Sequence, residues 1–82
     1  MNKLQVLGRE GHKELVWDPE KVKDGDLEAA AVIAEAERIL NEAVARGHLA
    51  LRVGAPDEPA VRIEKFDPTA PRTVIVPRIV GG

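Results

Sequence analysis

The segment Leu27–Arg46 limits the possible folds more than any other, because it contains neither glycine nor proline and is rich in alanine. Successive residues of a helix turn by about 100°, and on that wheel the apolar residues gather on one side. The residues predicted to face the core are Ala29, Ala30, Ile33, Ala36, Leu40, Ala43 and Val44, flanked by Val32 and Ile39. Asp26 is a predicted N-cap, and Gly47 is suited to the left-handed conformation that ends many helices. The chain therefore contains one long amphipathic helix.

Two short segments with alternating apolar residues, 3–7 and 12–17, precede this helix. Alternation with a period of two is typical of a half-buried strand. The turn between them, residues 8–11, has glycine at each end, which predicts a β-hairpin. Asp18-Pro19 ends the second strand, because proline breaks the ladder and disfavours helical space for the residue before it. The polar residues 20–25 predict a surface connection that has room for one helical turn.

Three further strands are predicted after the helix. Residues 48–53 carry leucine and valine on one face, and residues 60–66 alternate with Val61 and Ile63 directed inward. The turn between these two segments contains two prolines, which predicts a second hairpin with a semi-rigid turn. The last strand, Thr73–Val76, is apolar on both faces, as is typical of a central strand. We expect it to lie beside the first strand of the chain.

The predicted fold class is α+β, with the order β-β-α-β-β-β. The helix and both hairpins each have one apolar face, and one helix packed on one face of a mixed sheet buries all of them. Because the helix returns the chain by a crossover, a right-handed ββα unit is favoured. With 82 residues the chain forms one small domain with one core. We place this domain at residues 1–77 and expect residues 78–82 to form a flexible tail.

The predicted tail begins after Pro77, in the closing segment Val76-Pro77-Arg78-Ile79-Val80-Gly81-Gly82. Proline has no N–H to give to a sheet ladder, so strand pairing should fail there and the residues after it should leave the domain. The two glycines would then carry the terminal carboxylate on a thin stalk without side chains. An ordinary frayed terminus is the alternative interpretation.

Composition and charge exclude several classes of function. The chain has no cysteine, which excludes disulfides, thiolate metal sites and thiol catalysis and suits a cytoplasmic protein. The net charge is −2 and the only aromatic residues are Trp17 and Phe66, both expected in the core, so a nucleic-acid role is not expected. No apolar run approaches the roughly 18 residues of a membrane span, and no signal peptide is expected. His12 and His48 have no acidic cluster at ligand spacing, so we expect no metal site.

The predicted order of elements resembles the β-grasp, or ubiquitin-like, fold over roughly the whole chain. The closing segment Val74-Ile75-Val76-Pro77-Arg78-Ile79-Val80-Gly81-Gly82 looks like that of the sulfur-carrier members of this fold, the MoaD and ThiS type. Those proteins end in a hydrophobic strand, a proline, a small apolar residue and Gly-Gly. Two features differ: residues 67–71 leave little room for the second helix that carriers usually have, and Arg78 stands where they often have a second proline. The resemblance therefore suits a divergent prokaryotic or phage-encoded member as well as a pathway carrier.

The resemblance also implies a function for the end of the chain. The residues it implicates are Gly82 and Gly81 for activation and conjugation, and Pro77, Arg78, Ile79 and Val80 for contact with a partner. In this family an E1-like adenylating enzyme uses ATP to activate the terminal glycine. The activated group then passes to sulfur, for a sulfur-accepting enzyme, or to a lysine of a target protein. The chain would be a substrate that binds no cofactor, and not an enzyme.

A second interpretation of the same fold involves no conjugation. The chain would then be a β-grasp interaction or structural module, for example a component of a phage or of an assembling complex. Such a module would use a sheet edge or the helix face to bind its partner.

Overall fold

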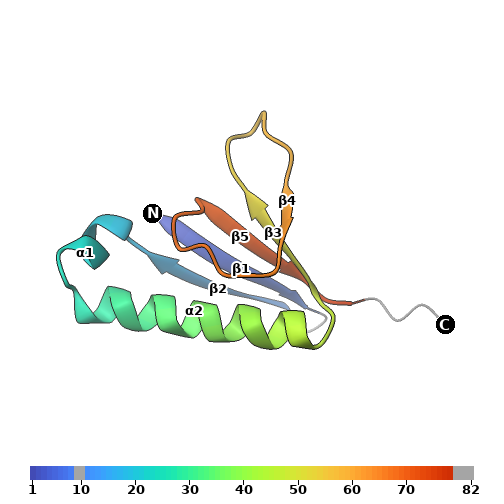
Figure 1. The fold of residues 1–82 in the computed structure, drawn as a ribbon, viewed down its shortest axis with the longest axis horizontal. Helices are drawn as coiled ribbons and strands as arrows, with labels where there is room; N and C mark the ends of the chain where they lie inside the picture. The colour runs from blue at the N-terminus through green and yellow to red at the C-terminus, as the bar shows by residue number, and fades with distance from the viewer. Residues whose placement is uncertain (9–10, 79–82) are drawn as a thin grey trace.

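The computed structural model describes residues 1–8 and 11–78, which form a small α+β domain with a mixed five-stranded sheet and one long helix (Figure 1). The strands are β1 (Asn2–Gly8), β2 (Gly11–Trp17), β3 (Leu49–Val53), β4 (Val61–Ile63) and β5 (Arg72–Val76). The helices are α1 (Pro19–Lys23) and α2 (Leu27–Ala45). The predicted α+β class and the single long helix are confirmed, and α1 occupies the connection in which one helical turn was expected.

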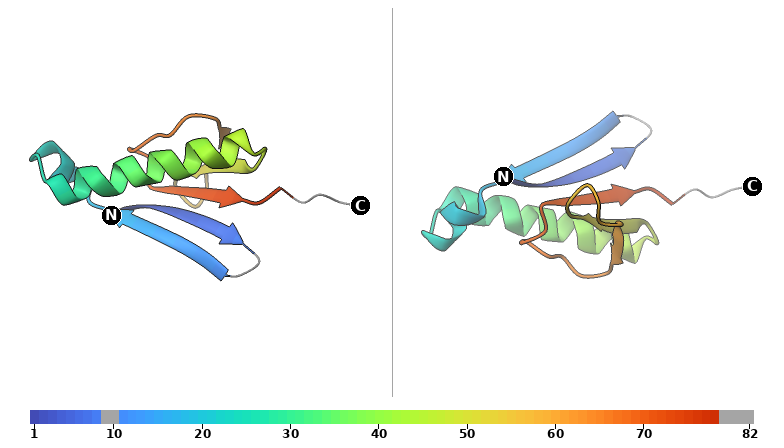
Figure 2. Two further views of the ribbon diagram at one scale, coloured as in Figure 1. Left: turned by 90° about the horizontal axis from the view of Figure 1, so that it is seen from below. Right: turned by 90° about the horizontal axis from the view of Figure 1, so that it is seen from above.

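The strands follow the spatial order β2-β1-β5-β3-β4, so β5 lies at the centre of the sheet. β1 pairs with β2 and β3 pairs with β4 in antiparallel hairpins, as predicted. β5 runs parallel to β1 and antiparallel to β3, and Figure 2 shows it between these two strands. The prediction that the last strand lies beside the first is therefore confirmed, and β5 joins the two hairpins into one sheet.

α2 lies across one face of the sheet, and the core fills the space between them (Figure 1). Leu4 of β1, Leu40 of α2 and Ile75 of β5 are almost completely buried there. Two alanines of the helix and Ala50 of β3 belong to the same core. Small side chains at these positions let the helix backbone approach the sheet closely, so that the larger residues between them interdigitate.

The ends of both helices follow their sequence signals. Asp26 caps α2, because its Oδ1 accepts hydrogen bonds from the N–H groups of Glu28 at 2.9 Å and Ala29 at 3.1 Å. Gly47 follows the helix with a φ of +83°, a conformation that costs other residues strain. Asp18 caps α1 in the same way, with Pro19 in the first turn. Local capping chemistry therefore determines where the helices begin and end.

The two aromatic residues close one end of the core. Trp17, only 2% exposed, lies with its ring centroid 5.7 Å from that of Phe66. The indole N–H of Trp17 donates to the carbonyl oxygen of Pro68 at 3.3 Å. Phe66 lies in the loop after β4 and packs against the core from there. The predicted core positions of both rings are confirmed.

The predicted core is wrong at three places. Ala30 is exposed on α2, because the helix turns it away from the sheet. Val61 is 54% exposed, since β4 is a short edge strand near the margin of the covered face. On β3 the buried residue is Ala50, opposite Ile75, so the leucines on either side of it point away from α2. The apolar face of β3 therefore lies on the side of the sheet that the helix does not cover.

Candidate functional site

The chain leaves the sheet directly after β5. The ladder between β3 and β5 ends with the pair Leu49 and Val76, immediately before Pro77, as the missing N–H of proline predicts. The backbone N–H of Arg78 then donates to Nδ1 of His48 at 2.8 Å. Arg78 is therefore attached to the body of the domain at the position where the tail was predicted to begin. The other four residues of the predicted site, Ile79, Val80, Gly81 and Gly82, lie outside the described residues.

His48 reaches this position because of the way α2 ends. The backbone N–H of His48 donates to the carbonyl oxygen of Ala43 at 2.9 Å, which closes the last turn of the helix. The positive φ of Gly47 reverses the chain, and β3 begins at the next residue, Leu49. Because Leu49 pairs with Val76, the side chain of His48 lies beside the residues that follow β5.

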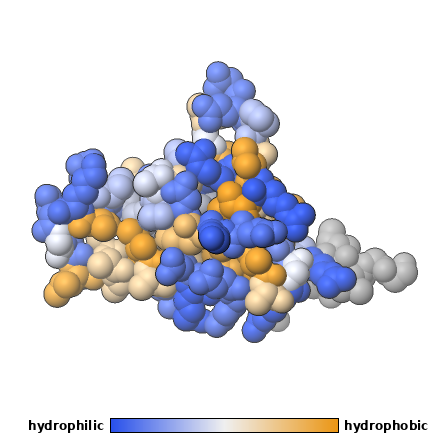
Figure 3. Space-filling model, viewed as in Figure 1, coloured by the Kyte–Doolittle hydropathy of each residue, from blue (hydrophilic) through white to orange (hydrophobic). Residues whose placement is uncertain are grey.

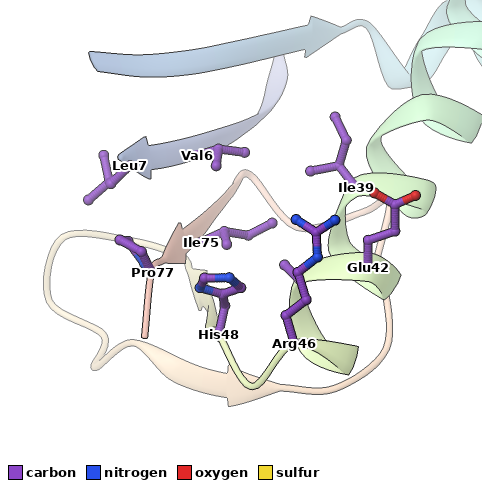
Figure 4. Close-up of a pocket in the computed structure, with 9 residues that line it drawn as sticks. Val6, Leu7, Ile39, Glu42, Arg46, His48, Ile75 and Pro77 are labelled. Carbon is purple, nitrogen blue, oxygen red and sulfur yellow. The ribbon is translucent and has the colours of Figure 1, made fainter. Parts of the chain in front are cut away.

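A cleft of about 150 Å³ opens at the same place, between the end of α2 and the ends of β1 and β5 (Figure 4). The apolar residues that line it are Val6, Leu7, Ile39, Ala43, Ile75 and Pro77. Glu42, Arg46 and His48 add polar and charged groups to the lining, and Figure 4 shows the imidazole between Pro77 and the Arg46 side chain. A cleft of this size has room for one small apolar side chain, with charged groups beside it.

The charges next to the cleft are unevenly paired. Glu42 accepts a hydrogen bond from Nη1 of Arg38 at 2.8 Å, and Arg38 also binds Glu35. Hydrogen bonds to these two carboxylates raise the pKa of Arg38, and the bond from Arg38 lowers the pKa of Glu35. Among the described residues, Arg46 and Arg78 form no ion pair. The end of the domain from which the chain leaves therefore carries two guanidinium groups that pair with no carboxylate of residues 1–8 and 11–78.

The uncovered face of the sheet carries a strip of aliphatic side chains, which we call the apolar strip. Its members are Leu49, Leu51 and Val53 of β3 and Val74 and Val76 of β5. Leu51 lies opposite Val74, and Leu49, which is 36% exposed, lies opposite Val76. Figure 3 shows hydrophobic surface at the base of the β3–β4 hairpin, below its hydrophilic tip.

Three cationic residues lie beside the apolar strip, and Glu14 of β2 lies on the same face of the sheet. Arg62 of β4 lies opposite Leu51, and Arg72 of β5 lies opposite Val53. Lys3 of β1 lies beside Arg72 in the parallel ladder, so all three occupy the uncovered face. This pattern is typical of a surface that binds another protein through a hydrophobic centre and a polar rim.

The comparisons with known proteins found no relative of this chain. It matches no protein-family model, and no curated protein or solved structure is significantly similar to it. In the part of the chain that the structure describes, no group of three or more histidine, aspartate or glutamate side chains is arranged to hold a metal ion. Neither α1 nor α2 has the length and the apolar character that crossing a membrane requires.

Sequence reasoning singled out Pro77 and Arg78 as expected contact residues, but it did not predict two features that the structure places beside them. It did not single out His48 as a neighbour of Arg78, because the contact joins residues 30 positions apart. The sequence feature that could have indicated this contact is the position of His48. It directly follows Gly47 and begins a strand predicted to belong to the same sheet as β5. The apolar strip was missed because its β3 residues were assigned to the covered face.

Proposed function

We propose that this chain is a small ubiquitin-like carrier or modifier with a β-grasp fold, which acts through the carboxylate of Gly82. The strand order β2-β1-β5-β3-β4, the parallel pairing of β1 with β5 and the single long helix support the β-grasp assignment. The observation that carries the functional proposal is the exit of the chain from the centre of the sheet at Pro77. The five residues printed after Pro77 end in two glycines.

The proposed chemistry begins with activation of the terminal carboxylate by an E1-like adenylating enzyme. A carboxylate oxygen attacks the α-phosphorus of ATP, pyrophosphate leaves, and an acyl-adenylate forms at Gly82. Attack of sulfide on the acyl carbon then expels AMP and leaves a thiocarboxylate. Alternatively, a cysteine thiolate of a partner attacks the acyl carbon and expels AMP, and a target lysine amine then displaces that thiolate and loses a proton to form an isopeptide bond. This chain has no cysteine, so the thiol belongs to the partner.

The sequence of the tail suits a reaction site that is closed to water. Gly81 and Gly82 can pass through a narrow channel, because they lack Cβ and accept most backbone conformations. Ile79 and Val80 would provide apolar contacts just outside such a channel. ATP would be bound by the activating enzyme, in the cytoplasm, and this chain would hold no cofactor.

The body of the domain supplies a surface on which that enzyme could dock. The apolar strip borders the exit of the chain, because Val76 is the last residue of β5 and directly precedes Pro77. The cations around the strip favour a partner surface with an apolar centre and an acidic rim. Pro77 and Arg78 would complete the contact between this surface and the reacting terminus.

The proposal is tested by incubating the chain with ATP and candidate adenylating enzymes. We expect release of pyrophosphate and, by mass spectrometry, a thiocarboxylate or a lysine adduct at Gly82. Deletion of Gly82 should abolish both products and leave the melting temperature unchanged, because β5 ends at Val76. A deletion variant that performs the biological role normally would contradict the proposal.

The apolar strip also favours a second candidate function, a β-grasp interaction module that is not conjugated. In that case binding would depend on the strip and not on the terminus. The substitution Leu51→Lys would abolish the biological role, whereas deletion of Gly82 would preserve it. The opposite result for the deletion would support the carrier.

A further inference from the structure

The hydrogen bond between Arg78 and His48 requires one protonation state of the imidazole. The donor is the backbone N–H of Arg78, and the acceptor is Nδ1 of His48 at 2.8 Å. A ring nitrogen accepts a hydrogen bond only when it carries no proton, so this contact requires the neutral ring with its proton on Nε2. In the imidazolium both ring nitrogens are donors. The Arg78 N–H would then face a second donor, and the bond would be lost.

This hydrogen bond continues the attachment of the chain where the sheet stops. Val76 is the last residue of β5, and Pro77 has no N–H to donate. Arg78 therefore has the first backbone N–H available after β5, and His48 accepts it. The side chain of Arg78 also lies close to Gly47, the residue before His48. A Cβ built on Gly47 would be 3.4 Å from Cδ and Nη1 of Arg78. Two consecutive residues of the α2–β3 connection thus hold Arg78.

The imidazole is itself held in place by its surroundings. It is half-buried and lines the cleft between Pro77 and Arg46 (Figure 4). The charged groups near it are Glu42 of α2, Arg46 at the C-cap of that helix, and the Arg78 guanidinium. The residues that β1 and β5 contribute to the cleft are uncharged. A change in the charge of this ring is therefore the direct way for pH to act on the contact.

We propose that His48 is a positioning residue, which holds the backbone of Arg78 where the chain leaves the sheet and releases Arg78 when its ring is protonated. Gly82 lies four residues beyond Arg78 in the sequence, and four extended residues span at most about 14 Å. The position of Arg78 therefore limits the positions that the Gly82 carboxylate can reach. The inference rests on the proposed function only for this last consequence. The contact between His48 and Arg78, which we call the clamp, is a property of the free protein.

The hydrogen bond is tested in the full chain, labelled with ¹⁵N, by NMR. We expect the ring nitrogens of His48 to report the neutral form protonated at Nε2 at pH 8. The substitution His48→Gln places its amide away from the Nδ1 position, and hydrogen exchange of the Arg78 amide should become about 5-fold faster. His48→Asn places an oxygen near the Nδ1 position and should restore slow exchange. Equal exchange rates in the wild type and in His48→Gln, or a proton on Nδ1 at pH 8, would overturn the proposal.

A pH titration tests the release. The amide shift of Arg78 should change together with the signals of the His48 ring when the pH is lowered, because the imidazolium has no acceptor nitrogen. In His48→Asn the Arg78 amide should no longer show this change. His12, the other histidine of the chain, is exposed on β2, so His12→Gln is the matched control and should leave the curve unchanged. An Arg78 amide that is insensitive to pH in the wild type would refute the release.

These results are independent of activation at Gly82, because none of the measurements requires an enzyme. If the clamp does not exist, His48→Gln leaves the Arg78 amide unchanged whether or not the terminus is adenylated. If the proposed function is wrong, deletion of Gly82 preserves the biological role while the clamp is still observed.

Discussion

The two faces of the sheet differ in the size of their side chains where β3 and β5 lie side by side. On the covered face, Ala50 and Thr73 are almost fully buried beneath the helix. On the uncovered face, the larger Leu51 and Val74 remain partly exposed. Close approach of an alanine-rich helix leaves room for small residues on the covered face. The larger aliphatic residues are then available to form a surface. Apolar character in a strand therefore does not by itself identify the face that packs in the core.

The largest effect is expected when a fully buried residue of α2, which packs on the covered face of the sheet, is truncated. Leu40→Ala should lower the free energy of unfolding by about 2–5 kcal/mol, because it removes buried methyl groups and leaves a cavity. Urea denaturation followed by circular dichroism measures this loss. Leu49→Ala, on the uncovered face, should cost less than about 1 kcal/mol. Equal losses for the two variants would mean that the two faces contribute equally to stability.

A smaller effect is expected when a small buried residue of α2 is replaced by a larger one. Ala36 is completely buried where α2 approaches the sheet, so Ala36→Leu should cost about 1–3 kcal/mol through overpacking. Thermal unfolding gives the difference. Ala34→Leu, at an exposed position of the same helix, is the control and should change stability by no more than about 0.5 kcal/mol. If Ala36→Leu is as stable as the control, the helix does not lie close to the sheet.

The contribution of Asp67, which lies in the loop after β4, to the free energy of unfolding should depend on pH. The hydroxyl and then the backbone N–H of Thr69 donate to Asp67, and Arg52 adds a third bond, so the pKa of Asp67 lies below its usual 3.8. A lowered pKa stabilises the fold above about pH 4, and this stabilisation is lost as the pH falls through the folded value.

Asp67→Asn should therefore cost at most about 1 kcal/mol at pH 7, because Asp67 and Arg52 are both more than a third exposed. The difference from the wild type should shrink as the pH is lowered below about 4. Urea denaturation at a series of pH values measures it. Asp57→Asn, in the exposed turn between β3 and β4, should not show this dependence. A cost that is constant with pH would exclude a contribution from the ionised carboxylate.

The smallest effect on stability is expected on the apolar strip. Leu51→Thr keeps a residue that favours strands and should change the free energy of unfolding by less than about 1 kcal/mol. Under the proposed function, its affinity for the activating enzyme should fall about tenfold, as measured by calorimetry. Val61→Thr, on the other face of the sheet, should leave that affinity unchanged. Loss of stability without loss of affinity would show that the strip belongs to the core.

Much of the fold could be predicted because its signals are local. Capping by Asp26 and the glycine at position 47 placed the long helix within a residue of its observed end at Ala45. Alternating residues identified the strands, and the doubly apolar Thr73–Val76 predicted the centre of the sheet. Alternation shows which residues of β3 share a face, however, and not which face the helix covers. That choice depends on how closely α2 approaches Ala50, which is a property of the whole fold.

Only those features of the candidate site that follow from the local sequence could be predicted. Pro77 marks the end of β5, because its effect on pairing is a property of the residue itself. The partner of Arg78 depends on three separate events: the turn at Gly47, the start of β3 and the pairing of Leu49 with Val76. No single stretch of sequence contains all of them. Such contacts have to be read from the assembled sheet.

The central position of β5 also affects how the protein matures. During synthesis, the segments before β5 can form two hairpins and a helix, but no strand joins the hairpins into one sheet until Arg72–Val76 is made. An isolated hairpin is at best marginally stable in water, and the pairing of β1 with β5 closes a loop of almost the whole chain. A product cut short before β5 would therefore fail to fold and be open to proteolysis. We therefore expect a chain to fold only after its synthesis has proceeded through β5.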